Sequence, residues 1–164
     1  MPVLNFAMQD QEESEWCWAA VAASIALHYS GSSPWTQCKV AEAELNEKKC
    51  CQKPVPSACN RRWRLHSTLR TTQNLSRYTT RREAFAVIQQ EINNGRPLCA
   101  RIGWKGSISG HFVLIDGYDE SSGTQFVMVR DPNPLVRTAL VNYATLVKGY
   151  QGTGSWTDSF FTQP

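Results

Sequence analysis

Residues 16–29 read WCWAAVAASIALHY, the most continuous apolar segment of the chain. Alanine is the strongest helix former, and apolar side chains surround the whole circumference, which is typical of a buried central helix. Ser14 is a suitable N-cap, three glutamates nearby suit the positive end of the helix dipole, and Gly31 suits a C-terminal stop. We therefore expect a long buried helix at the centre of the fold.

Other helical patterns lie in the first hundred residues. Residues 36–49 show a second helical pattern, and the next ten residues contain two prolines and predict a loop. Residues 80–83 read TRRE, which matches a capping box, and they precede apolar residues at helical spacing. This third helix is expected to end near Gly95.

Strand patterns dominate the second half of the chain. The predicted elements are strands at 98–104, 111–118, 125–130 and 155–161, and a short helix at 143–148. Helices followed by an antiparallel sheet indicate an α+β fold with segregated halves. We find no internal repeat or linker, so we expect a single domain over residues 1–164.

The composition excludes several classes of protein. A length of 164 residues fits one domain, and 41% hydrophobic residues is too high for a disordered chain. The net charge of +3 is too small to suggest nucleic-acid binding by itself. No apolar run approaches the roughly 18–20 residues that span a bilayer, and no apolar N-terminal signal segment is present.

Cys17 is the first candidate functional residue. It lies in the first turn of the predicted central helix, where the helix dipole favours a thiolate. A thiolate beside a base is a nucleophile, whereas an isolated cysteine in a helix is often only a small buried apolar residue. The choice between these readings depends on a partner base.

His111 is the candidate base. It begins a strongly apolar strand after a glycine-rich loop, so it is placed to face a cleft, and its near-neutral pKa suits acid–base chemistry. The competing interpretation is a surface histidine at a strand end. His28, late in the central helix, and His66, in a basic segment, are interpreted as structural or solvated.

Asp131 is the candidate partner of His111. It ends the strand that is expected to pair with the His111 strand, so a hairpin would bring the two residues together. A carboxylate there can hold the imidazole in the required tautomer, although the sequence Asp-Pro-Asn-Pro also fits a plain turn. Asp116 and Asp119 lie at the far end of the strand and are poor alternatives.

Gln11 is the candidate oxyanion donor. It lies six residues before Cys17, and a side-chain amide can form an oxyanion hole with the backbone N–H of the nucleophile. Gln9 is a competitor two residues earlier.

Together these motifs resemble the papain-like cysteine peptidases. The resemblance is carried by Gln11, five intervening residues and Cys17 within Trp-Cys-Trp-Ala-Ala, then by Gly-His111-Phe-Val and Asp131-Pro, and it extends over residues 9–161. The compact bacterial branch, which includes avirulence proteases and peptidase toxins, is the most similar. The bacteriocin-leader peptidases are more distant.

The resemblance implies a fold and a set of roles. The fold would be a cysteine-bearing helix packed on an antiparallel sheet that supplies the histidine and the acid. Gln11 would be the oxyanion donor, Cys17 the nucleophile, His111 the base and Asp131 the orienter. Papain has asparagine in place of the acid, which leaves Asn133 as a rival of Asp131.

The resemblance also implies a cysteine endopeptidase that is secreted or delivered into a target cell as a bacterial effector or toxin. Export would require a dedicated secretion system or a larger parent polypeptide. We expect a protein substrate and a cognate inhibitor or immunity protein, but no cofactor, metal or membrane partner. Two alternatives remain: a deamidase, transglutaminase or acyltransferase with the same triad, and a non-catalytic binding module stapled by disulfides or zinc.

The other five cysteines divide into two kinds. Cys99 lies in a predicted strand and is expected to be a buried, inert thiol. The other four allow two unstrained disulfide pairings: Cys38–Cys50 with Cys51–Cys59, or Cys38–Cys51 with Cys50–Cys59. Reduced thiols or a zinc site are the competing interpretations, but no Cys-x-x-Cys pair occurs. Disulfides would imply passage through an oxidising compartment.

Residues 60–82 contain seven arginines and no acidic residue, together with Trp63. Such a stretch could contact nucleic acid or an acidic substrate. We favour a solvated face and do not expect a nucleic-acid partner.

Overall fold

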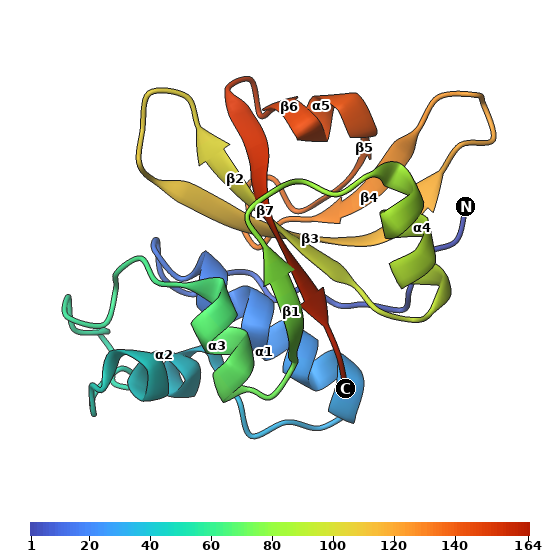
Figure 1. Ribbon diagram of the computed structural model, residues 1–164. Coiled ribbons are helices and arrows are strands. Elements are labelled where there is room, and N and C mark those ends of the chain that lie inside the picture. The colour runs from blue at the N-terminus through green and yellow to red at the C-terminus, as the bar shows by residue number, and fades with distance from the viewer.

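The computed structural model describes all residues from 1 to 164 and has an α+β fold (Figure 1). Its central helix α1 runs from Cys17 to Ser30, and the residues Cys17–Ala26 are all buried. Gly31 ends the helix in the left-handed conformation, with a φ of 67°. The expected buried central helix is therefore confirmed, as is its C-terminal stop.

The predicted N-cap of α1 is wrong. The cap residue is Trp16, which provides no side-chain hydrogen bond, while the Ser14 hydroxyl accepts a hydrogen bond from Asn60 Nδ2 at 3.0 Å. A turn in which Trp16 N–H donates to Glu13 O, at 3.1 Å, leads the chain into the helix. Cys17 consequently becomes the first helical residue.

Two further helices pack beside α1, and two more lie across the sheet (Figure 1). Their bounds are α2 Gln37–Leu45, α3 Leu65–Thr71, α4 Phe85–Asn93 and α5 Tyr143–Val147. The capping box predicted at residues 80–83 is wrong, because α4 begins at Phe85 after an uncapped Ala84. Glu83 instead accepts a hydrogen bond from the Thr79 hydroxyl at 2.7 Å.

The sheet is antiparallel throughout, with the order β1-β7-β2-β3-β4-β5, and β6 pairs with β7. The strands are β1 Leu75–Thr79, β2 Leu98–Trp104, β3 Gly110–Asp119, β4 Phe126–Arg130, β5 Thr138–Asn142, β6 Lys148–Tyr150 and β7 Gly154–Thr162. The basic stretch at 60–82, interpreted as a solvated face, supplies both α3 and the edge strand β1.

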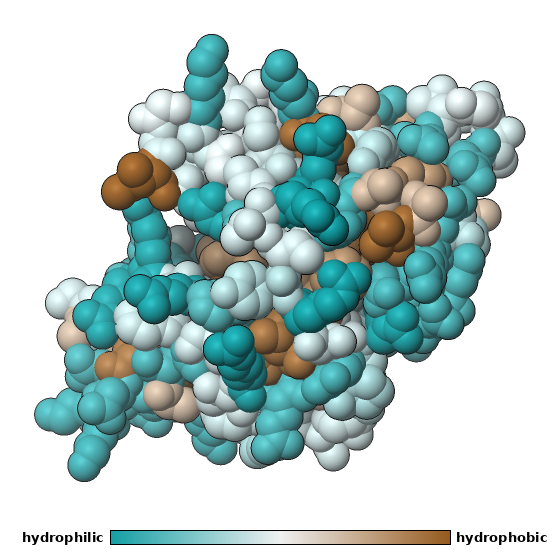
Figure 2. All heavy atoms as spheres, in the orientation of Figure 1, coloured by the Kyte–Doolittle hydropathy of each residue, from teal (hydrophilic) through white to brown (hydrophobic).

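Two apolar clusters cover opposite faces of the sheet. Helices α1, α2 and α3 contribute to one cluster, which includes the fully buried Trp16 and Trp18. Helices α4 and α5 contribute to the other, which contains Phe85 and Leu146. On the face drawn in Figure 2 the apolar side chains form small separate groups in a mostly hydrophilic surface. None of the helices combines the length and hydropathy that crossing a bilayer requires.

Candidate active site

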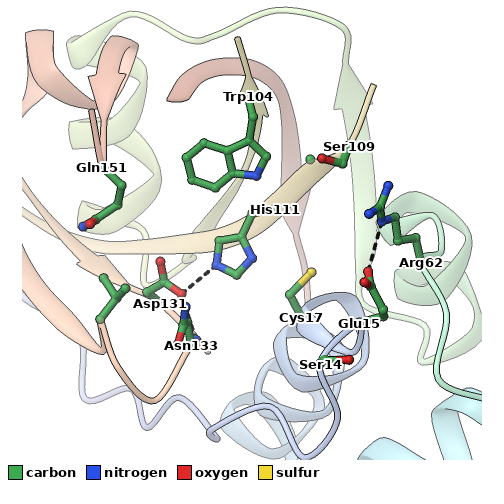
Figure 3. A pocket seen from close by; sticks show the side chains of 12 residues that line it. Ser14, Glu15, Cys17, Arg62, Trp104, Ser109, His111, Asp131, Asn133 and Gln151 are labelled. Atoms are coloured by element: carbon green, nitrogen blue, oxygen red, sulfur yellow. Dashed lines mark hydrogen bonds and ion pairs between the residues drawn. The ribbon is translucent and has the colours of Figure 1, made fainter. Parts of the chain in front are cut away.

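The fold brings together the predicted nucleophile, base and acid, although they lie in three different elements (Figure 3). Cys17 opens α1, His111 is the second residue of β3, and Asp131 directly follows β4. Because β3 and β4 pair antiparallel, the end of β4 lies near the start of β3. His111 Nε2 lies 2.6 Å from Asp131 Oδ1.

The Cys17 side chain faces the other edge of the imidazole (Figure 3). Cys17 is 8% exposed and lines the cleft. The backbone N–H groups of Cys17 and Trp18 donate to no acceptor of the chain, and the first helical bond runs from Ala20 N–H to Trp16 O. The positive end of the α1 dipole is therefore free to stabilise negative charge beside the sulfur.

The surroundings of His111 favour its protonated form. Burial alone would lower the pKa of the imidazole, but hydrogen bonds to Asp131 and Cys17, with the charges of these groups, raise it from 6.5 to about 10. An imidazolium held between a carboxylate and a sulfur is arranged to stabilise a thiolate and to donate a proton.

Asp131 is held by three donors. Its carboxylate is 3% exposed and accepts hydrogen bonds from His111, from Tyr150 Oη at 2.7 Å and from the Asn133 backbone N–H at 2.8 Å. The Asn133 side chain accepts a hydrogen bond from Leu135 N–H within the turn and forms none with His111. The structure therefore pairs His111 with Asp131 and not with the rival Asn133.

Tyr150 is a site residue that the sequence analysis missed. It ends β6, and burial together with the charge of Asp131 raises the pKa of its phenol, which keeps it a proton donor to the carboxylate. A tyrosine before a Gln-Gly turn has no motif that would identify it, because its contact with Asp131 depends on the pairing of β6 with β7.

Replacing Tyr150 with phenylalanine should lower kcat about tenfold and leave KM nearly unchanged. The change removes one donor and leaves a buried carboxylate oxygen unpaired, which typically costs about 1–3 kcal/mol. Tyr143→Phe is the matched control, because its hydroxyl donates to Glu83 O at 2.7 Å, away from Asp131. Equal kcat values for the two variants would show that Tyr150 is only structural.

Gln11 is not aimed at the cleft. Its Nε2 donates to Glu13 O at 2.9 Å and to Ser14 O at 2.8 Å, so both amide hydrogens are used by the turn before α1. The competitor Gln9 instead accepts a hydrogen bond from Gln37 on α2. The oxyanion role of Gln11 stays a prediction, and it requires the amide to leave at least one of these carbonyls.

The cleft has an aromatic wall and a charged wall. Trp104 stacks on His111 with ring centroids 6.4 Å apart, while Arg62 pairs with Glu15 at 3.0 Å on the opposite side (Figure 3). The cavity in front of the triad has a volume of about 340 Å³. A smaller cavity adjoins Cys17 and is lined partly by Trp63 and Phe112.

The loop at residues 59–62 supports the turn that carries Cys17. Trp16 Nε1 donates to Cys59 O at 2.7 Å, Trp18 Nε1 donates to Arg61 O at 3.0 Å, and Glu15 N–H donates to Asn60 Oδ1 at 3.0 Å. These bonds link the residues on both sides of Cys17 to one segment. The position of the 59–62 loop therefore affects the position of the Cys17 sulfur.

Disulfides hold the chain leading into this loop. Cys38 bonds to Cys51 and Cys50 bonds to Cys59, which is the second of the two pairings considered from the sequence. Cys99 is a buried free thiol, and burial raises its pKa.

The remaining candidates from the sequence lie outside the cleft. The His28 ring packs against Phe6, and the His66 ring stacks on Tyr78. Asp116 is buried and paired with Arg130 at 2.7 Å.

A helix-borne cysteine facing a histidine and an acid on an antiparallel sheet defines a class, and this protein is a papain-like cysteine protease. More particularly, the chain belongs to the Peptidase_C39-like family, whose model matches residues 3–159. The resemblance to the effector and toxin branch stays a prediction.

Solved structures of peptidase domains share this fold. The chain is similar to the peptidase domain of Streptococcus ComA, a bifunctional ABC transporter involved in quorum sensing, with a TM-score of 0.62 and 14% identity over 98% of this chain and 100% of that domain. The Streptococcus mutans ComA domain gives 0.55 and 12%, with full coverage of both chains. Procathepsin L 3 of Tenebrio molitor gives 0.56 and 10%, over 99% of this chain and 67% of that one. At these identities the likeness concerns the fold alone. No curated protein sequence matches the chain significantly.

Proposed function

We propose that this protein is an endopeptidase that cleaves a target protein through Cys17, His111 and Asp131. The observation that carries the proposal is the imidazole of His111, which lies between the Cys17 sulfur and the Asp131 carboxylate (Figure 3). The same three groups can serve either hydrolysis or transfer of an acyl group, and membership of the Peptidase_C39-like family favours hydrolysis.

In the proposed mechanism the Cys17 thiolate attacks the scissile carbonyl carbon and forms a C–S bond. The Cys17 backbone N–H stabilises the oxyanion. As the C–N bond breaks, the His111 imidazolium gives its proton to the leaving amine, which leaves a thioester on the enzyme. Water then attacks the thioester, His111 takes its proton, and the C–S bond breaks to release the carboxylic acid. Asp131 orients His111 through both steps.

Mass spectrometry of an unfolded protein substrate tests this proposal. Hydrolysis should produce fragments whose summed mass exceeds the intact mass by about one water per cleavage, and Cys17→Ala should produce none. A deamidase would leave the chain intact and add about one dalton per site. Intact substrate with such a gain would contradict the peptidase function.

The pH dependence of kcat/KM is a second prediction. The group that gives up its proton is the His111 imidazolium, whose pKa is raised to about 10, so activity should persist through neutral pH and fall as the pH rises through about 10. Since the hydrogen bond to Asp131 is the largest cause of the raised pKa, Asp131→Ala should move this fall toward neutral pH. A fall near pH 6.5 in the unmodified enzyme would contradict the prediction.

We also propose that the peptidase is a bacterial effector or toxin that is secreted or delivered by a dedicated system. Two disulfides within residues 38–59 support passage through an oxidising compartment. The cavity in front of the triad offers a separate inhibitor protein a place to bind. Growth of bacteria that express the active chain or Cys17→Ala, in the cytosol or exported to the periplasm, tests this role. Equal growth of all four strains, and of target cells given the protein, would contradict it.

A further inference from the structure

A hollow beside the cleft carries positive charge. It lies between the tip of the β2–β3 hairpin and the tip of the β6–β7 hairpin, in the upper part of Figure 1. Arg101, Lys105 and Lys148 supply its cations, and no carboxylate lines it. Arg101 has a distant partner in Asp158, at 3.8 Å, but the two lysines are exposed and form no ion pair.

The lining of this hollow suits carboxylates better than apolar side chains. Apart from the cations and Trp104, it consists of glycine, serine and threonine. The side chains of Arg101 and Thr157 lie over Gly103, where a larger residue would leave them little room. A Cβ at this position would lie 3.0 Å from Thr157 Cγ2 and 3.3 Å from Arg101 Nη1. Thr157 Oγ1 also accepts a hydrogen bond from Arg101 at 3.0 Å, which fixes the guanidinium. The hollow therefore offers one hydrogen-bonded cation and two exposed ones, lined by small polar residues.

The hollow and the active-site cleft share one wall residue. Trp104 lines both cavities and stacks on His111. Under the proposed function, His111 protonates the leaving amine, which belongs to the residue C-terminal to the scissile bond. A substrate chain on that side therefore passes Trp104 and reaches the cations.

We propose that this hollow binds acidic side chains of the protein substrate, C-terminal to the scissile bond. The inference rests on the proposed peptidase function and names its substrate class. Nucleic acid fits less well, because its binding uses many phosphate contacts and exposed aromatic platforms for bases. The hollow has three cations, and the only aromatic residue in it is stacked on His111.

A peptide library tests the inference without a known substrate. Peptides prepared from a denatured proteome are incubated with the full chain, and new N-termini are identified by mass spectrometry. Acidic residues should be over-represented in the first ten or so positions after the cleaved bond. For one cleaved peptide, replacing these residues by their amides should lower kcat/KM about fivefold, as expected for exposed charge pairs.

Charge reversal supplies the matched comparison. Lys105→Glu combined with Lys148→Glu should exchange the acidic preference for a basic one, whereas Lys39→Glu with Lys48→Glu, on the exposed surface of the helical half, should leave it unchanged. Cleavage without acidic enrichment, enrichment only on the N-terminal side, or enrichment that survives the charge reversal overturns the inference alone. Absence of any Cys17-dependent cleavage overturns the proposed function, and the inference with it.

Discussion

Replacing Cys17 with alanine is expected to reduce peptide hydrolysis by a factor on the order of 10⁴ or more, because loss of a triad nucleophile leaves only the contributions of binding and the oxyanion hole. The change removes a single sulfur atom at the border of the cleft, where the side chain is 8% exposed. The loss should therefore appear in kcat at an almost unchanged Tm. Initial rates on a cleaved library peptide and a thermal melt of each protein measure the two effects.

Cys99→Ala is the matched control for this prediction. It removes the same atom from the other free cysteine, which is fully buried in the apolar cluster and lies outside both cavities. This variant should lose about 1 kcal/mol of stability and keep its activity. Native labelling with iodoacetamide should modify Cys17 rapidly and Cys99 slowly. Full activity in Cys17→Ala, or equal labelling of the two thiols, would refute the assignment of the nucleophile.

The parts of the fold that the sequence predicted are those with strong apolar patterns. Residues 16–29 are apolar around the whole helix, and the strand that begins at His111 is a continuous apolar run, so burial determines both elements. The antiparallel pairing of β3 with β4 then places Asp131 beside His111, which is why this pair could be anticipated.

Elements stabilised by tertiary contacts could not be predicted in the same way. The edge strand β1 has three exposed residues among five and occurs within an arginine-rich stretch, so its pairing with β7 leaves little apolar pattern. The start of α1 depends on Asn60, which binds Ser14 from 46 residues away and removes it from the capping position. Tyr150 and the 59–62 loop also reach the site through contacts between residues that are distant in the sequence, so no local pattern identifies them.

Removing the disulfide between Cys50 and Cys59 should have the second largest effect. Both residues are almost fully buried in the apolar cluster, and Cys59 O accepts the hydrogen bond from Trp16 Nε1. The double alanine variant should lose about 2–4 kcal/mol of unfolding free energy. Because the 59–62 loop holds the residues on both sides of Cys17, kcat should fall as well, even well below the new Tm.

The disulfide between Cys38 and Cys51 allows this stability effect to be separated from the effect on catalysis. Cys51 is exposed, and neither residue forms a hydrogen bond with the residues on either side of Cys17. The Cys38→Ala, Cys51→Ala variant removes a disulfide that has no comparable link to the active site. It should lose stability and keep nearly full kcat. Denaturant unfolding and initial rates on one peptide compare the two pairs. If both variants keep the same kcat, the 59–62 loop does not position Cys17. A fall in kcat confined to the Cys50–Cys59 variant shows that this disulfide keeps the nucleophile aligned. The enzyme would then need an oxidised Cys50–Cys59 pair together with a reduced Cys17.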